Sequence, residues 1–270
     1  MPYLYSQCED IACRSIAPLQ DTPANKFTYD ARIKVATNYT VKMSANDTGS
    51  AANATDNTTT FSFECNIPIQ SYLIAIAVGD LKEASVGNVT SPGGTQVKVI
   101  TEPGYLDTVT NEFSGLGEVM QSVEDLFPLN PYAWGNYTIL VLSPSFPMGG
   151  MENPLLTFAS PTVIVGDKSQ VYVAAHEMAH SWTGNTVTCA DWANFWLNEG
   201  FTVYYERRSK IARDKGDETI SLENAFIGNQ SAYTSMVQYG LWNSYSSLHP
   251  NVRDDLPDNS FSTIPYEKGF

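Results

Sequence analysis

Residues 171–200 read VYVAAHEMAHSWTGNTVTCADWANFWLNEG, and this stretch decides how the rest of the chain is interpreted. Two of the three histidines, His176 and His180, stand four positions apart with Glu177 between them. Residues i and i+4 of a helix project from the same face, so both imidazoles can reach one tetrahedral ion at about 2.0–2.1 Å. Glu177 can serve there as a general base. The spacing predicts a metal site on a helix over residues 171–183.

A third ligand is expected from Glu199, which eighteen residues separate from His180 and which begins a second helix predicted over 194–213. Two histidines and one carboxylate leave the fourth position of zinc open, as in catalytic sites. Glu206 follows seven positions later on the same helix face, where it can orient a ligating imidazole; an ordinary surface carboxylate is the alternative. Two structural histidines on a helix are the alternative for the pair.

Composition narrows the classes of function. The chain has 270 residues, of which 43% are hydrophobic, so it can bury a core. The net charge is −14 and no run of Lys or Arg occurs, so no nucleic-acid partner is expected. The longest apolar run, residues 72–78, is far shorter than the roughly 20 residues that cross a bilayer, so no membrane span is expected.

The compartment signals conflict. Four scattered cysteines form no CxxC pair, so buried thiols are expected rather than a disulfide framework or a thiolate zinc site. No signal peptide is expected, because Met1 leads into a polar segment. Against this, seven N-x-S/T sequons favour a secretory route with glycosylation, although an Asn-, Ser- and Thr-rich sequence also produces them. The cysteines are Cys8, Cys13, Cys65 and Cys189, and the sequons begin at Asn38, Asn46, Asn53, Asn57, Asn88, Asn136 and Asn229.

The sequence pattern changes near residue 82. Before it, residues 26–80 contain period-two alternation and predict β structure, with a polar, mobile loop over 44–60 and a buried strand over 72–78. After it, residues 106–126 have helical spacing and residues 137–142 predict a strand. We place a domain boundary near residue 82.

The motifs resemble one family. HExxH followed after eighteen residues by Glu199 is the pattern of the gluzincin peptidases, and residues 149–154 (GGMENP) look like the exopeptidase motif of the zinc metallo-aminopeptidases. Residues 180–185 (HSWTGN), 196–200 (WLNEG) and 265–270 (PYEKGF) match as well. With residues 6–8 (SQC) and 20–23 (QDTP), they point to the subgroup of leukotriene A-4 hydrolase and aminopeptidase B. The resemblance is weakest over residues 44–60.

The resemblance implies an α+β fold. Residues 1–82 would be the C-terminal part of an N-terminal β-sandwich-like domain. Residues 83–270 would form a thermolysin-like, largely helical zinc peptidase domain, truncated at its C-terminal side. Members of the family are more than twice this length, so the chain is expected to be a fragment with uncovered apolar faces. One Zn²⁺ on His176, His180 and Glu199 is implied.

The resemblance also implies a pocket for the substrate. Glu152 is similar to the family carboxylate that pairs with the cationic α-amine, and Gln7 and Glu9 match positions that line the same pocket. The preceding segment Gly149-Gly150-Met151 would let a substrate backbone lie alongside as an added strand; an ordinary Gly-rich turn is the alternative.

Two further residues are implied near the end of the chain. Tyr266 matches the family tyrosine that donates to the developing oxyanion. Asp258 aligns with the acidic residue that leukotriene A-4 hydrolase uses on its epoxide, with an ordinary loop aspartate as the alternative. Phe261 stands where that enzyme has tyrosine, which weakens the expectation of lipid handling.

The expected function is removal of the N-terminal residue from peptides with a free N-terminus, with Glu177 as general base. Hydrolysis of a leukotriene-like fatty-acid epoxide is implied by resemblance alone. A catalytically incompetent fragment or peptide-binding module of the same fold stays open, as does an endopeptidase, against which the GGMEN segment argues. The resemblance favours a cytoplasmic location, and the sequons favour secretion.

Overall fold

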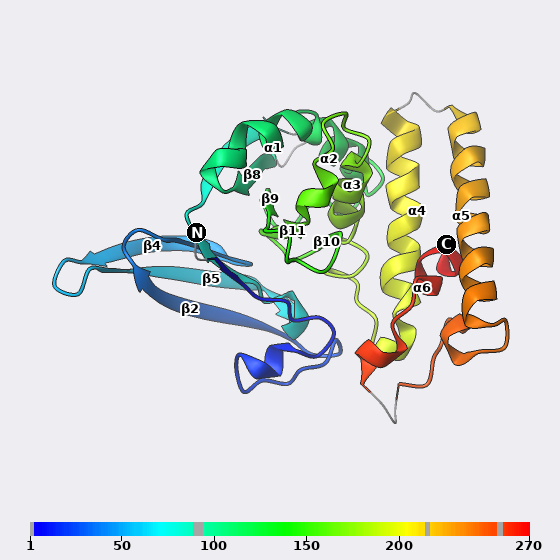
Figure 1. Cartoon of the computed structure of the whole chain (residues 1–270), viewed down its shortest axis with the longest axis horizontal. Helices are drawn as coiled ribbons and strands as arrows, with labels where there is room; N and C mark the ends of the chain where they lie inside the picture. The colour runs from blue at the N-terminus through cyan, green and yellow to red at the C-terminus, as the bar shows by residue number, and fades with distance from the viewer. Residues whose placement is uncertain (1–2, 89–93, 214–216, 253–255) are drawn as a thin grey trace.

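The computed structural model describes residues 3–88, 94–213, 217–252 and 256–270. A β-rich N-terminal part is followed by a five-stranded sheet with helices, and then by a group of helices that ends the chain (Figure 1). This arrangement confirms the predicted α+β fold. Residue 82 begins β7 (Lys82–Asn88), the first strand of the five-stranded sheet, while the domain boundary there stays a prediction.

Two antiparallel three-stranded sheets make up the N-terminal part. The first has the order β2-β5-β4, formed by β2 (Lys26–Ala36), β5 (Thr58–Gln70) and β4 (Asn46–Asn53). The second has the order β1-β6-β3, formed by β1 (Leu4–Tyr5), β6 (Ile76–Gly79) and β3 (Thr40–Met43). In β2, exposed side chains alternate with half-buried ones, which is the period-two pattern seen in the sequence.

Strand β4 corrects the prediction of a mobile loop over residues 44–60. All eight of its residues are exposed, yet its backbone pairs with β5 from Asn46↔Glu64 to Asn53↔Thr58. Backbone hydrogen bonds hold such an edge strand whatever its side chains are, so composition did not reveal it. The strand predicted over 72–78 is also shorter, because a 3-10 turn (Ser71–Leu73) precedes β6.

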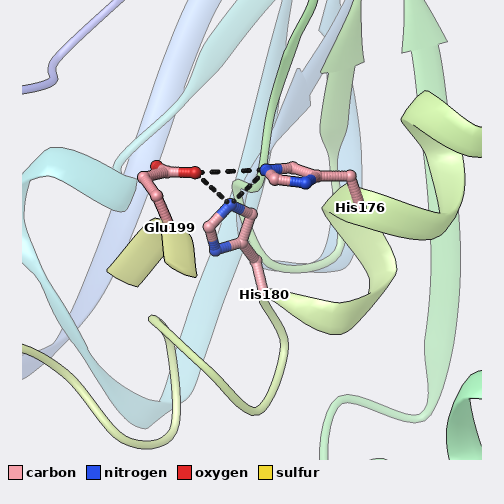
Figure 2. A group of neighbouring side chains, drawn as sticks. All are labelled: His176, His180 and Glu199. Atoms are coloured by element: carbon pink, nitrogen blue, oxygen red, sulfur yellow. Dashed lines mark hydrogen bonds and ion pairs between the residues drawn. The ribbon is translucent and has the colours of Figure 1, made fainter. Parts of the chain in front are cut away.

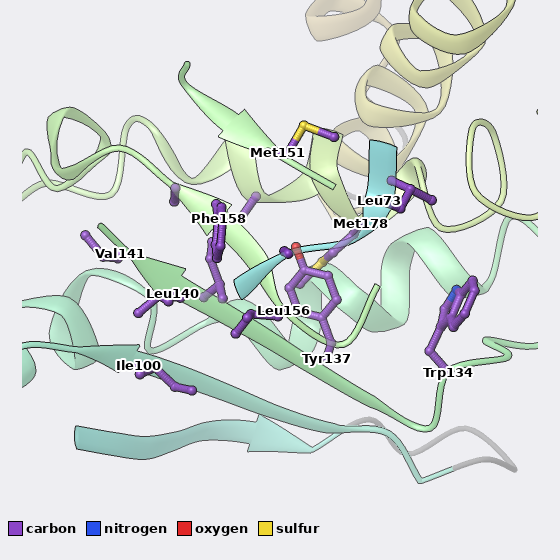
Figure 3. Packing of buried hydrophobic residues seen from close by; sticks show 14 of the residues in the cluster. Leu73, Ile100, Trp134, Tyr137, Leu140, Val141, Met151, Leu156, Phe158 and Met178 are labelled. Atoms are coloured by element: carbon purple, nitrogen blue, oxygen red, sulfur yellow. The ribbon is translucent and has the colours of Figure 1, made fainter. Parts of the chain in front are cut away.

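The five-stranded sheet has the order β10-β11-β9-β8-β7. Strands β8 (Gln96–Thr101), β9 (Asn136–Val141) and β11 (Thr157–Ala159) run parallel, and β7 and β10 (Gly150–Met151) are antiparallel edges. Strand β9 confirms the strand predicted over 137–142. Its Tyr137 and Leu140 pack with Phe158 of β11 and with Met178 from the neighbouring helix in the main core (Figure 3).

Some helices pack against this sheet, and the later ones pack mainly against other helices. The predicted helices over 171–183 and 194–213 correspond to α3 (Val171–Ala179) and α4 (Trp196–Arg213). The single helix suggested by residues 106–126 is two helices, α1 (Leu106–Glu112) and α2 (Leu116–Glu124), because the backbone leaves helical geometry at Phe113 and Gly115.

Helix α5 (Glu218–Tyr239) was not predicted. Its described apolar side chains do not gather into one buried stripe, and Leu222, Phe226 and Tyr233 are exposed, so no amphipathic period marks the helix. Helix α5 lies beside α4, and the short α6 (Ile264–Gly269) packs against both (Figure 1). Within the described residues, no helix is both long and apolar enough to cross a membrane.

Candidate metal centre and active site

Three side chains from two packed helices meet at one point (Figure 2). His176 lies on α3, His180 directly follows that helix, and Glu199 lies in the first turn of α4. His176 Nε2 is 3.1 Å from Glu199 Oε2 and 3.1 Å from His180 Nε2. His180 Nε2 is 3.4 Å from the same carboxylate oxygen. The helix spacing read from the sequence therefore brings these three predicted ligands together.

The outer nitrogen of each imidazole is held by a neighbour. His176 Nδ1 donates to Glu206 Oε2 at 3.0 Å, and His180 Nδ1 donates to the Thr183 carbonyl at 2.9 Å. We assign these tautomers from the acceptors around the rings. Both Nε2 atoms then carry lone pairs that face the Glu199 carboxylate.

Three lone-pair donors this close repel one another unless bound protons or a metal ion lie among them. A tetrahedral ion with ligands at about 2.0–2.1 Å holds its donor atoms about 3.3 Å apart, which is the spacing found here. The donor chemistry, two neutral imidazoles and one carboxylate, is also that of catalytic zinc sites. The residues therefore fit a zinc ion.

Charges in the centre depend on one another. Burial works against ionisation of Glu199, but His180 and His176 outweigh it and lower the pKa of this carboxyl to about 2. Burial likewise lowers the pKa of His180, but the nearby Glu152 and Glu199 raise it to about 9. The imidazoles therefore hold protons until a metal replaces them.

Glu177 lies beside this centre on the buried side of α3, and burial raises the pKa of its carboxyl to about 8. Gly150 of β10 makes room for it, because a Cβ at that position would overlap the Glu177 carboxylate. The absence of a side chain at Gly150 therefore leaves space for the Glu177 carboxylate, in addition to leaving the strand edge open. A carboxyl that titrates near neutral pH is suited to general acid–base chemistry.

The predicted amine pocket is only partly assembled in the cleft. Glu152 is buried, and its Oε1 accepts from Asn198 Nδ2 at 3.3 Å and lies 3.9 Å from His180 Nδ1. Glu9 lines the same cleft, and burial together with the charge of Glu152 raises its pKa. Gln7 instead donates to Met151 Sδ at 3.3 Å, and neither of these two residues is among the described residues that line the cleft.

Tyr266 reaches the centre from α6. Its ring lies nearly parallel to that of His176, with 6.1 Å between centroids, and meets Phe195 edge-on at 6.0 Å. Burial raises the pKa of its phenol well above the usual value, so the hydroxyl stays protonated at neutral pH. The structure thus provides a proton donor at the edge of the metal centre.

One cleft of about 810 Å³ is lined by the three predicted ligands and by Glu9, Glu152, Glu177 and Tyr266. This cleft is also lined by three further predicted residues, Asp258, Gly149 and Gly150, and by Phe261. Sequence reasoning missed Asp10, Asn198 and Arg207. All three adjoin predicted residues in the chain, namely Glu9, Glu199 and Glu206, but no motif or spacing assigned them a role.

Comparisons with known proteins place the chain among related sequences. The profile of the Peptidase family M1 domain matches residues 112–270, and that of the Peptidase M1 N-terminal domain matches residues 1–73. Leukotriene A-4 hydrolase of Xenopus laevis is 45% identical over 270 residues, which are 100% of this chain and 42% of the relative. Leucine aminopeptidase 2 of Emericella nidulans is 42% identical over 275 residues, with the same coverage. The chain thus spans about two fifths of the length of the curated relatives it matches.

Solved structures show the same fold. Yeast LTA4 hydrolase in complex with Bestatin superposes with a TM-score of 0.87 at 41% identity, over 100% of this chain and 40% of that one. An M1 zinc metallopeptidase from Deinococcus radiodurans superposes with a TM-score of 0.78 at 22% identity, over 99% of this chain and 56% of that one. The second likeness shows the fold alone.

Proposed function

Because this chain belongs to peptidase family M1, we propose that it is a zinc-dependent aminopeptidase that hydrolyses the N-terminal residue of peptides with a free α-amine. One observation carries the proposal: His176, His180 and Glu199 converge in a cleft that also holds the buried carboxyls of Glu177 and Glu152. The three convergent donors would hold one Zn²⁺.

Zinc bound there would polarise the scissile carbonyl and acidify the attacking water. Glu177 would take the proton from that water and pass it to the leaving amine. Glu152 anchors the cationic α-amine of the substrate through a charge-assisted contact. Tyr266 donates its phenolic proton in a hydrogen bond to the oxyanion as charge develops.

Strand β10 supports a defined place for the peptide. It is an edge strand of the five-stranded sheet and carries Gly150, beside Gly149, along the cleft. An extended peptide can add to such an edge through backbone hydrogen bonds. Its first residue would then lie between Glu152 and the metal centre.

The test is Glu177→Gln, measured with aminoacyl-nitroanilides. We expect turnover to fall by about 10²–10⁴-fold, since the general base is lost, while zinc content is unchanged. Turnover retained in the variant would contradict the mechanism. Hydrolysis of N-acetylated peptides by the wild-type chain would favour an endopeptidase, and bound zinc without turnover would favour a peptide-binding module.

A second candidate activity is hydrolysis of a fatty-acid epoxide, as the name of the Xenopus relative suggests. It is favoured by one observation: Asp258 lines the same cleft as Glu152. Asp258→Asn should abolish conversion of an allylic fatty-acid epoxide to its diol and leave alanyl-nitroanilide turnover within about threefold. If the wild-type chain leaves the epoxide unchanged, peptide hydrolysis remains the proposed function.

A cytoplasmic location is also proposed. All four cysteines are buried free thiols, which fits a reducing compartment. The asparagines of all seven sequons are exposed, so each would be open to glycosylation if the chain entered the secretory pathway. A mass decrease on treatment of protein from its native source with an N-glycosidase would overturn the cytoplasmic proposal.

A further inference from the structure

We propose that Arg207 is a positioning residue that acts through Glu267 on Tyr266. Arg207 lies on α4, and Glu267 directly follows Tyr266 on α6. The inference rests on the proposed function, in which Tyr266 contacts the reacting carbonyl. No role for Arg207 or Glu267 is suggested by the metal-binding pattern.

The ion pair between the two helices is close and mostly buried. Arg207 Nη2 lies 2.7 Å from Glu267 Oε1 and 2.8 Å from Oε2. The two side chains are only 13% and 19% exposed. The Arg207 guanidinium also stacks 4.5 Å from the centre of the Phe270 ring. Arg207 of α4 therefore contacts α6 at the residue after Tyr266, and it contacts Phe270 just beyond the end of α6.

Helix α6 depends on such contacts for its position. It has six residues, which is too short to be stable by itself. Near its end the backbone touches α4, because a Cβ at Gly200 would stand 2.5–2.7 Å from Gly269. Lys268 Nζ donates to the Ser246 carbonyl at 2.8 Å on another side. Tyr266 is thus placed by packing at residue 269 and by the ion pair at Glu267.

Helix α5 packs against the ion pair between Arg207 and Glu267. A Cβ at Gly228 would stand 2.7–2.8 Å from the Arg207 guanidinium nitrogens and would overlap Glu267. The guanidinium therefore has little freedom to move. It is held where α4, α5 and α6 meet.

Helix α4 consequently relates the metal centre to the oxyanion donor. Its Glu199 is a predicted ligand, its Glu206 holds His176, and its Arg207 holds the residue beside Tyr266. A rigid helix fixes the separation of these groups. Loss of the Arg207 charge would leave the Glu267 carboxylate buried without its cation, and α6 would shift to solvate it.

A double-mutant cycle on the 270-residue chain tests this inference. Arg207→Met and Glu267→Gln are each made in the wild-type and the Tyr266→Phe backgrounds, and kcat and KM are measured on one aminoacyl-nitroanilide. Each change should lower kcat by about 10- to 100-fold in the wild-type background, with KM within about twofold. Neither should lower it further when Tyr266 is absent. Arg208→Met, at the exposed neighbouring position, is the matched control and should leave kcat unchanged.

Equal losses in both backgrounds, or no loss, would overturn the proposal. If the Arg207→Met protein does not fold, the nearly isosteric Glu267→Gln variant tests the proposal in the same double-mutant cycle. If the wild-type chain has no turnover, the proposed function fails separately, and hydrogen exchange then decides. Faster exchange of residues 264–270 in both variants, with residues 171–180 unchanged, supports the positioning role, whereas unchanged exchange overturns it.

Discussion

At the scale of single residues, Gly150 determines whether Glu177 can occupy its place. A Cβ there would overlap the Glu177 carboxylate, whereas a Cβ at Gly149 would have no atom within 4 Å. Gly150→Ala should therefore displace the proposed base and lower kcat by about 10²-fold, with zinc still bound. Gly115→Ala, where an added Cβ would also have no atom within 4 Å, is the control outside the cleft and should retain turnover. Equal activity of the two variants would contradict the assigned contact.

Asp10 gives the stability of the metal-free protein a pH dependence. Burial, Asp258 and Glu199 raise its pKa to about 7 from an ordinary value of 3.8. The native state then binds a proton more tightly than the unfolded state between these values, so stability falls as pH rises from about 4 to about 7. The loss is on the order of 2 kcal/mol, since part of the side chain is solvated.

Thermal unfolding of chelator-treated protein checks this expectation. Asp10→Asn should make the decline between pH 4 and pH 7 shallower, with the rest due to the raised pKa values of Glu9 and Glu177, and should raise the melting temperature at pH 8. A variant with the wild-type pH profile would show that another group is responsible.

Individual site residues were predictable where the chain itself sets their distance. One helical turn joins His176 to His180, so the sequence was enough to propose that pair. Arg207 and Glu267 lie sixty positions apart, and only the packing of α4 on α6 joins them. Gln7 was assigned through resemblance, and its contact with Met151 required the folded chain.

At the scale of elements, the contact of α4 with α6 is close enough to reverse an ordinary trend. Alanine normally stabilises a helix relative to glycine by about 0.5–1 kcal/mol. At Gly200, however, the added Cβ would meet the Gly269 backbone, which cannot move independently of α6. Gly200→Ala should therefore destabilise the protein by about 1–3 kcal/mol.

Urea unfolding measures this effect. Gly104→Ala serves as the control, because a Cβ there would have no atom within 4 Å. A stabilised Gly200→Ala protein would mean that helix propensity outweighs the clash and that α6 is less tightly held than described.

Elements with buried apolar side chains were the ones that sequence patterns revealed. Helix α3 buries Val171, Ala174 and Met178 at helical spacing, and strand β9 buries its apolar run at residues 139–141. Strand β4 and helix α5 were missed because most of their described side chains are exposed, so hydrophobic periodicity was absent.

At the scale of the whole molecule, a bound metal would tie α3 to α4. In its absence the imidazoles keep their protons, since Glu152 and Glu199 raise the pKa of His180 to about 9. Zinc must displace these protons, so its affinity should increase as pH rises from 6 to 9. Excess zinc should stabilise the fold by about 4 kcal/mol when its concentration is 1,000 times Kd.

Scanning calorimetry with and without chelator measures the stabilisation, and zinc titration at several pH values measures the affinity. Removing zinc should lower the melting temperature, and adding zinc back should restore it. If the chelator leaves the melting temperature unchanged, zinc binding does not stabilise the folded state.

Helix α4 carries Glu199, Glu206 and Arg207, and their fixed spacing limits which changes in chain length the protein can tolerate. Each residue added to a helix turns everything beyond it by about 100° around the axis. One codon inserted between Glu199 and Glu206 would therefore rotate both Glu206 and Arg207 away from their partners, although no existing side chain had been altered. The turn between β4 and β5, which lies in Figure 1 at the end of the sheet remote from α3 and α4, can lengthen freely. Descendants of this chain should thus differ in length at that turn and keep the length of α4 fixed.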